Sequence, residues 1–98
     1  MTSEKLDYEI VHNEPHGLWE IRLQPDGKVI GYLSYDVNDT EIYITSTTVH
    51  RDYRGRGLAE ELVRTVLDYE KEQGVHKIVP ICSYVQRFVA ENPDYPIA

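Results

Sequence analysis

The hydrophobic period of this chain changes abruptly at the segment Val49–Ala59, and that change constrains the fold more than any other feature. Before the segment, apolar and polar residues alternate as they do in β-strands. After it, apolar residues recur every three or four positions, as in an amphipathic helix. The segment itself crowds Arg51, Arg54 and Arg56 beside two glycines. A strand-rich half must therefore lead into a long helix through a loop rich in arginine and glycine.

The half before this segment predicts four strands joined by tight turns. The expected strands are Leu6–Asn13, Leu18–Leu23, Lys28–Val37 and Glu41–Val49. The connections carry turn residues, and the stretch from Pro25 to Lys28 is the clearest, because proline pre-sets φ and Asp-Gly tolerates a positive φ. Short connections between consecutive strands favour an antiparallel meander.

The half after the segment predicts a helix, a strand and a second helix. The apolar stripe of the first helix runs from Leu58 to about Gln73, and Gly74 is a good stop for it. A strand at His76–Cys82 would then lie parallel to the fourth strand, in a right-handed βαβ unit. Ser83 is the expected cap of a last helix from Tyr84 to about Ala90. The sequence thus predicts one α+β domain over residues 1–98.

Composition narrows the function classes. Acidic residues outnumber basic ones 17 to 10, which argues against nucleic acid as the main partner. The excess acid suits a cationic partner such as an amine, or serves only to keep a small domain soluble. No apolar run approaches the roughly 20 residues that cross a membrane, and no signal peptide is recognisable. A single cysteine excludes an internal disulfide and fits the cytoplasm. The histidines show no metal-ligand spacing, so no metal site is expected.

The loop before the first helix predicts an anion site. A glycine turn at a helix start presents several unpaired backbone N–H groups, and these together with the helix dipole bind phosphate. The alternative is a solvated turn with a capping glycine. The loop is not a P-loop, because no Gly-Lys-Ser/Thr follows. It is not a dinucleotide fingerprint either, because Glu60 stands where the third glycine should be.

Arg54-Gly55-Arg56-Gly57-Leu58-Ala59 fits the pattern Arg/Gln-x-x-Gly-x-Gly/Ala, and in this position between strand and helix it resembles the GNAT acetyltransferase superfamily. The stretches Val79–Val85 and Asn92–Tyr95 are similar to a subgroup of short, single-domain GNAT-like proteins that carry a cysteine after the last strand. The resemblance covers most of the chain and implies a minimal GNAT-like fold.

The resemblance also implies acetyl-CoA as cofactor and an amine as acceptor. It implies that the loop holds the pyrophosphate, that the arginines reach the remaining phosphate charge, and that the pantetheine arm pairs with the fourth strand. The implied contacts are Thr47, Thr48, Val49, Arg51, Arg54, Gly55, Arg56, Gly57, Leu58 and Ala59. The chain departs from the subgroup where Ser46-Thr47 and Arg51 replace a histidine-threonine pair and a proline, and no acceptor site can be carried over. A monomer or weak dimer is expected.

Two further residues are candidates for chemistry. Cys82, at the start of a helix, would have a lowered pKa and could accept the acetyl group, or it is a small buried core residue. Tyr84 could protonate the departing CoA thiolate, or it only packs. The leading hypothesis is an acetyltransferase acting on a primary amine, either directly or through Cys82. The second is a non-catalytic CoA-binding or acyl-CoA-binding module that acts through a protein partner, and a third, weaker one is an interaction domain without a nucleotide.

Overall fold

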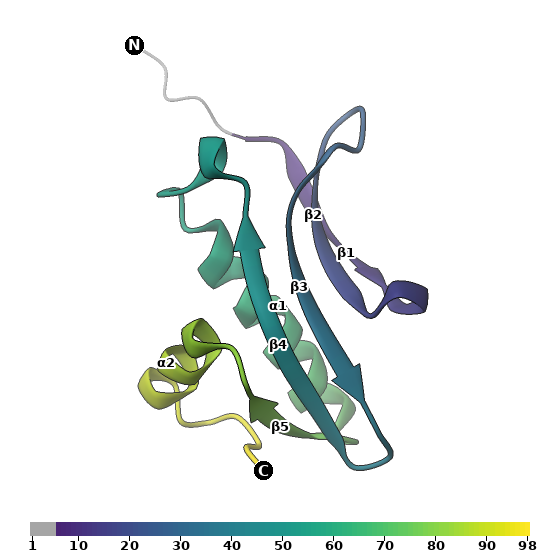
Figure 1. The fold of residues 1–98 in the computed structure, drawn as a ribbon, viewed down its shortest axis with the longest axis vertical. Coiled ribbons are helices and arrows are strands. Elements are labelled where there is room, and N and C mark those ends of the chain that lie inside the picture. Colours follow the sequence, from purple (N-terminus) through teal and green to yellow (C-terminus); the bar gives the residue numbers. More distant parts are fainter. Residues whose placement is uncertain (1–5) are drawn as a thin grey trace.

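The structure, a computed structural model, describes residues 6–98, and the polar start of the chain at residues 1–5 lies outside the described part. Five strands form one mixed sheet in the order β1-β2-β3-β4-β5, with two α-helices (Figure 1). The elements are β1 (Tyr8–Asn13), β2 (Leu18–Leu23), β3 (Val29–Val37), β4 (Glu41–Val49), α1 (Leu58–Gln73), β5 (Lys77–Pro80) and α2 (Ser83–Glu91). Single 3-10 turns occur at Glu14–His16 and Arg51–Tyr53.

The predicted α+β order and the antiparallel meander are confirmed. β1 to β4 pair antiparallel with their neighbours, and β5 adds to β4 in parallel after the α1 crossover. The turn at Pro25 is also confirmed, since Gly27 has a φ of +78° and its N–H donates to the carbonyl of Leu23. The first and third strands begin later than predicted, at Tyr8 and Val29.

The last strand and the last helix differ more from the prediction. β5 spans only Lys77–Pro80, because the ladder with β4 ends at the Ile44–Pro80 pair. The N–H groups of Ile81 and Cys82 both donate to the carbonyl of Ile44, so the chain turns away from the sheet there. As a result α2 begins at Ser83, and Cys82 occupies the N-cap position that had been expected for Ser83.

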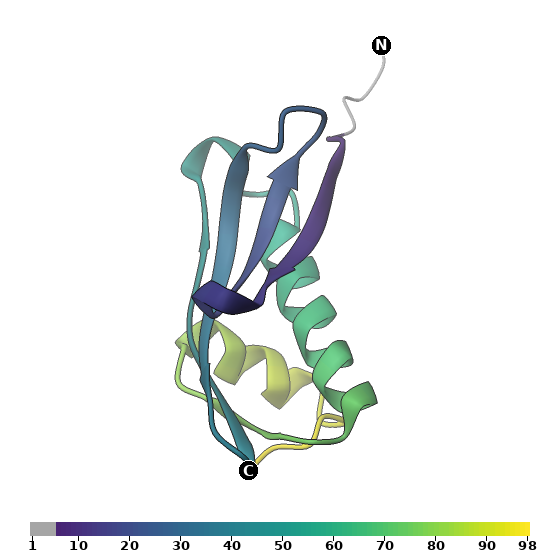
Figure 2. The same ribbon diagram turned by 90° about the vertical axis from the view of Figure 1, so that its right-hand side faces the viewer.

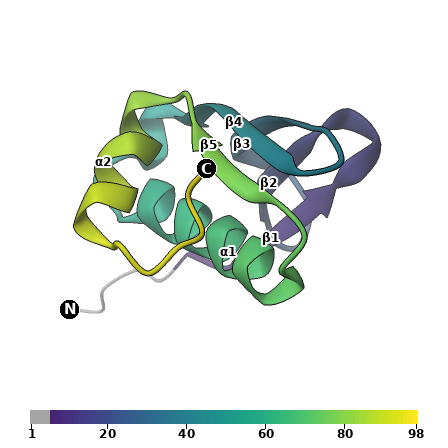
Figure 3. The same cartoon turned by 90° about the horizontal axis from the view of Figure 1, so that it is seen from below.

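Helix α1 covers one face of the sheet, while the opposite face has no helix over it in the described part of the chain (Figure 2). Its buried stripe, continued by residues of the sheet and of α2, forms one hydrophobic core. The core residues are Trp19, Ile21, Ile30, Leu33, Ile42, Ile44, Val49, Leu58, Leu62, Val63, Val66, Leu67, Ile78, Val85 and Phe88. Seen from below, α2 lies beside α1, next to β4 and β5 (Figure 3). Neither helix in the described residues is long and apolar enough to span a bilayer.

β4 contains a bulge that sequence periodicity did not reveal. Ser34 on β3 pairs with Ser46, while the next residue, Tyr35, pairs with Ile44, so Thr45 is an extra residue on β4. The Ser34 hydroxyl holds this geometry, because its Oγ lies 2.7 Å from the Thr45 hydroxyl and 2.6 Å from the Ser46 hydroxyl. A bulge shifts the side-chain alternation by one residue. Beyond it, therefore, Thr47 rather than Ser46 faces the helices.

Candidate functional site

The loop between β4 and α1 leaves a row of backbone amides without protein acceptors. Gly55 and Gly57 have φ values of +80° and +78°, and a Cβ built on either meets no atom within 4 Å. The first helical hydrogen bond runs from the N–H of Glu61 to the carbonyl of Gly57. Among residues 6–98, the N–H groups from Gly55 to Glu60 therefore have no acceptor. Exposed amides at a helix N-terminus are a ready-made anion site.

Three arginines surround these amides. Arg54 is anchored, because its Nε donates a 2.9 Å hydrogen bond to the carbonyl of Val49 at the end of β4. Arg51 and Arg56 are exposed. Within the described residues none of the three forms a salt bridge. They add positive charge at the positive end of the α1 dipole, where Glu60 and Glu61 of the first helical turn also stand.

A cavity of about 270 Å³ lies against this loop. The loop glycines, the first turn of α1 and the end of β4 form one wall, and Tyr84 of α2 forms the other. Leu58 and Val49 give the cavity a buried apolar base. The structure thus brings together the loop and one of the two residues predicted for chemistry, although nearly thirty residues separate them in sequence.

The upper half of β4 has a free edge on the β5 side. β5 pairs with β4 only from Glu41 to Ile44, and in Figure 1 β5 and α2 flank only the lower half of β4. The N–H of His50 donates to β3, and main-chain direction alternates along an antiparallel strand. The main-chain groups of Thr48 therefore face β3, whereas those of Thr47 and Val49 face the gap. Of these, the carbonyl of Val49 is already occupied by Arg54.

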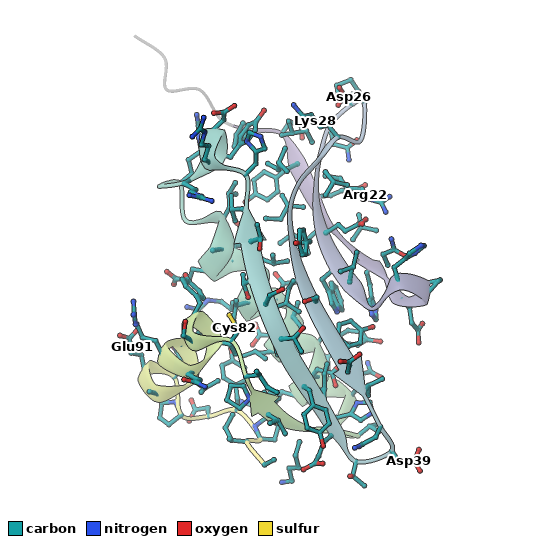
Figure 4. The ribbon with its side chains drawn as sticks, in the orientation of Figure 1. Arg22, Asp26, Lys28, Asp39, Cys82 and Glu91 are labelled. Atoms are coloured by element: carbon teal, nitrogen blue, oxygen red, sulfur yellow. The ribbon has the colours of Figure 1, made fainter. Side chains whose placement is uncertain are left out.

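Cys82 lies at the bottom of this gap, at the start of α2 and beside β4 (Figure 4). Its Sγ is 3.7 Å from the hydroxyl oxygen of Thr47. Burial, the largest single influence, opposes ionisation of the thiol. It is outweighed by the N–H groups of Val85 and Tyr84, and by the hydroxyl and N–H of Thr47, and together these lower the pKa of Cys82. The Cys82 side chain is partly buried and packs against the hydrophobic core. The hydrogen-bond donors around its sulfur polarise the thiol at the same time.

The other predicted residues have more modest surroundings. Tyr84 is 37% exposed, and its pKa is raised, first by burial and then by the nearby charge of Glu60. A phenol that stays protonated can donate a proton. His50, at the end of β4, is exposed, and its Nδ1 accepts the N–H of Asp52. Among residues 6–98 no group of three or more His, Cys, Asp or Glu side chains could hold a metal ion.

Sequence reasoning missed two features of this half of the molecule. The first is the bulge at Thr45, which turns Thr47 toward Cys82. The second is Glu70, a carboxylate that is only 6% exposed and that accepts a hydrogen bond from His76 Nδ1 at 3.0 Å. Glu70 could have been found, because it continues the i, i+4 apolar stripe of α1 after Leu62 and Val66. The bulge left no comparable signal.

The sequence profile of the family described as GCN5-related N-acetyl-transferase matches residues 19–97. Protein NATD1 of Danio rerio is 30% identical over 84 residues, which cover 86% of this chain and 76% of that protein. Protein NATD1 of Bos taurus is 45% identical over 47 residues. That match spans 48% of this chain and only 41% of the bovine protein.

Solved structures show the same fold. A GCN5-related N-acetyltransferase from Sphaerobacter thermophilus superposes with a TM-score of 0.60 at 24% identity, over 68% of this chain and 21% of that one. A structure described as a predicted acetyltransferase with acetyl-CoA, from Clostridium acetobutylicum, has a TM-score of 0.52 at 21% identity, over 86% of this chain and 61% of that one. At these identities the likeness establishes the fold alone.

Proposed function

The chain belongs to the GCN5-related N-acetyltransferase family, and on that premise we propose that it moves an acetyl group from acetyl-CoA to a primary amine. The observation that carries the proposal is the row of amides from Gly55 to Glu60 without acceptors, flanked by three arginines that form no salt bridge with residues 6–98. A pyrophosphate can accept hydrogen bonds from these amides and pair with the positive charge of the arginines. The Clostridium structure named above is described with acetyl-CoA, which supports the same cofactor for this fold.

The free edge of β4 supports a path for the pantetheine arm. The carbonyl of Thr47 and the N–H of Val49 face the gap beside β5, and an arm with two amide groups can satisfy such edge groups. The N–H of Thr47 is already directed to the Cys82 sulfur. Arg54 keeps the Val49 carbonyl, and Thr48 turns its main chain to β3. We therefore assign the pantetheine contacts to Thr47 and Val49 rather than to Thr48. The arm would then point from the loop toward Cys82.

Bound acetyl-CoA supplies a thioester carbonyl that is open to attack by a nucleophile. On the covalent route the Cys82 thiolate adds to this carbonyl, the bond to the CoA sulfur breaks, and the departing thiolate takes the phenolic proton of Tyr84. A deprotonated amine next attacks acetyl-Cys82, Cys82 leaves as thiolate, and the proton lost by the amine goes to the Tyr84 phenolate. On the direct route the amine attacks first, and Cys82 and Thr47 only shape the site. A reducing compartment such as the cytoplasm would keep Cys82 a free thiol.

A non-catalytic acyl-CoA-binding module is the second candidate, and one observation favours it. Within the described residues, no histidine or carboxylate hydrogen-bonds to Cys82, Thr47 or Tyr84. The carboxylate in the lining of the loop cavity, Glu60, is paired with Arg64 at 3.0 Å, so it is not free to take the first proton from a charged amine. On this second candidate, the loop binds CoA and the chain acts through a partner protein.

Calorimetry with acetyl-CoA, followed by a transfer assay on polyamine and on lysine peptides, separates the two candidates. Binding with turnover supports the enzyme, whereas binding without turnover supports the module. Absence of CoA binding at millimolar concentration contradicts both. Mass spectrometry after mixing with acetyl-CoA tests the covalent route, which predicts one acetyl group on Cys82. Full transfer activity in Cys82→Ala would exclude that route and leave direct attack.

A further inference from the structure

A second cavity, of about 150 Å³, lies at the other end of α1. Tyr69 and Glu70 of α1, His12 and Tyr35 of the sheet, and His76 before β5 contribute to its wall, with Glu14 at the rim. It shares no lining residue with the cavity at the glycine loop. Glu70 lies twelve residues after Leu58, which is about 18 Å along a helix. The space holds several water molecules, and so a ligand of a few heavy atoms.

Glu70 gives this cavity a buried negative charge. Its side chain is 7% exposed and stands on the apolar stripe of α1, where Leu62 and Val66 are fully buried. One carboxylate oxygen, Oε1, accepts the hydrogen bond from His76 Nδ1. The other, Oε2, has no donor among residues 6–98. Oε2 is not enclosed by protein atoms, so it is accessible to a donor from outside the chain.

Aromatic rings build the rest of the wall. The His12 ring stacks on Trp19 with centroids 4.1 Å apart, and Tyr69 meets both rings edge-on at 5.7 and 5.2 Å. The Tyr35 hydroxyl lies 2.6 Å from His12 Nε2, which fixes both rings. Of these rings His12, Tyr35 and Tyr69 line the cavity, and the π faces of tyrosines attract cations.

The charge in and around the cavity is negative. Its lining contains the carboxylates of Glu14 and Glu70, the histidines His12 and His76, and neither lysine nor arginine. Of the two histidines, His76 is paired with Glu70. The pKa of Tyr35 is raised, first by burial and then by these two carboxylates, so their field is felt inside the cavity. An anion or a strongly hydrated neutral group would gain nothing there.

From these features we infer that the cavity binds the ammonium group of a primary alkylamine, either a free small amine or a lysine side chain. An ammonium has three N–H donors, one of which satisfies Glu70 Oε2, while its charge faces the carboxylates and the rings. This site differs from an acceptor site for acetyl transfer, because it holds the amine in the charged form, which has no lone pair to attack a thioester. It also lies at the opposite end of α1 from the glycine loop.

Trp19 is the single tryptophan of the chain, and its contact with His12 makes its fluorescence a local reporter. Titration with n-propylammonium chloride should give a saturable change, and n-propanol and sodium chloride at equal concentration should not. Nα-acetyl-lysine methylamide forms the second arm. Binding of this compound identifies a protein side chain as ligand, and binding of n-propylammonium alone identifies a free amine. Failure of both, or an equal response to n-propanol, overturns the inference.

Glu70→Gln tests the charge, because it keeps an acceptor for His76 and removes only the negative charge. We expect at least tenfold weaker binding in this variant. Glu72→Gln, an exposed change on the same helix, should leave the affinity as it was. Equal affinity in Glu70→Gln and the wild type contradicts the inference.

Nuclear magnetic resonance of the wild-type chain gives a readout that depends on no variant. Bound n-propylammonium must shift the signals of Tyr69, Gln73 and His76 and leave those from Gly55 to Ala59 in place. Movement of the loop signals alone would overturn the assignment to this cavity. The ammonium titration does not depend on the proposed CoA site at the glycine loop. Gly57→Val, which alters that loop, should bind n-propylammonium as the wild type does, whether or not the wild type binds CoA.

Discussion

Gly57 combines two properties that matter to the loop. Its φ of +78° lies in the left-handed region, and a Cβ built on it meets no protein atom within 4 Å. The space above it is therefore open to a ligand, and only glycine adopts this φ without strain. Gly27, in the β2–β3 turn, has the same φ of +78° and equally open surroundings, but it does not line the cavity at the loop.

These two glycines form a matched pair of variants. Gly57→Val and Gly27→Val should each cost about 1–3 kcal/mol of stability, because a β-branched residue is strained at positive φ. Only Gly57→Val should abolish CoA binding, since its side chain fills the space above the amides. Urea unfolding measures the first effect and calorimetry the second. Unchanged CoA affinity in Gly57→Val would exclude the loop as the phosphate site.

Cys82 is the residue whose chemistry depends most on its neighbours. Its pKa is lowered because the amides of α2 and the Thr47 side chain outweigh the effect of burial. The thiolate is therefore present at lower pH than in an ordinary cysteine, and it is lost as the pH falls through the lowered pKa.

Alkylation by iodoacetamide measures this shift. The rate should rise with pH and reach half its maximum at a lower pH than it does for an ordinary exposed cysteine, because the pKa of Cys82 is lowered. Thr47→Val removes the hydroxyl contact, so its half-maximum should move to higher pH. A wild-type midpoint above the usual value would mean that burial dominates, and the nucleophilic role of Cys82 would then lose its support.

At the scale of elements, the two halves of β4 differ in what lies beside them. Up to Ile44 it pairs with β5 and closes the sheet, and beyond the bulge it has a free edge beside the loop. The Ser34 hydroxyl binds both Thr45 and Ser46 and so stabilises the bulge. Ser83, by contrast, is exposed and makes no capping hydrogen bond.

Two serine-to-alanine variants compare these roles. Ser34→Ala should lower the free energy of unfolding by about 1–2 kcal/mol, because two hydrogen bonds in a half-buried position are lost. Ser83→Ala should change it by less than about 0.5 kcal/mol, as surface substitutions usually do. Urea denaturation of both proteins provides the comparison. Equal stabilities would show that the bulge does not depend on the Ser34 hydroxyl.

At the scale of the whole molecule, α1 connects the two proposed sites. Its N-terminus presents the amides of the loop, and its C-terminal half presents Glu70 to the second cavity. One face of the sheet packs against α1. The packing that buries Leu62 and Leu67 therefore also holds the two ends of α1, and with them the two proposed sites, in position. A ligand at either end should therefore stabilise the folded chain as a unit.

Thermal unfolding tests this linkage. CoA at one hundred times its dissociation constant should add about 2.7 kcal/mol, which raises the Tm of a domain of this size by about 10–20 °C. Pantetheine, which lacks the phosphates, should raise the Tm much less at the same concentration. Equal shifts with CoA and pantetheine would show that the phosphates contribute nothing, and the role assigned to the loop would fail.

The sequence determined what depends on local pattern. Alternation and turn residues predict the four-stranded meander, helical spacing predicts α1, and Arg54-Gly55-Arg56-Gly57 identifies the family and the candidate phosphate loop. Each of these signals involves residues close together in the chain. Only the tertiary structure decided the rest. The bulge at Thr45 arises from pairing with Ser34, the contact of the Cys82 thiol with the Thr47 hydroxyl arises from the approach of α2 to β4, and the burial of Glu70 arises from the packing of α1. These are contacts between residues distant in sequence, and no local pattern encodes them.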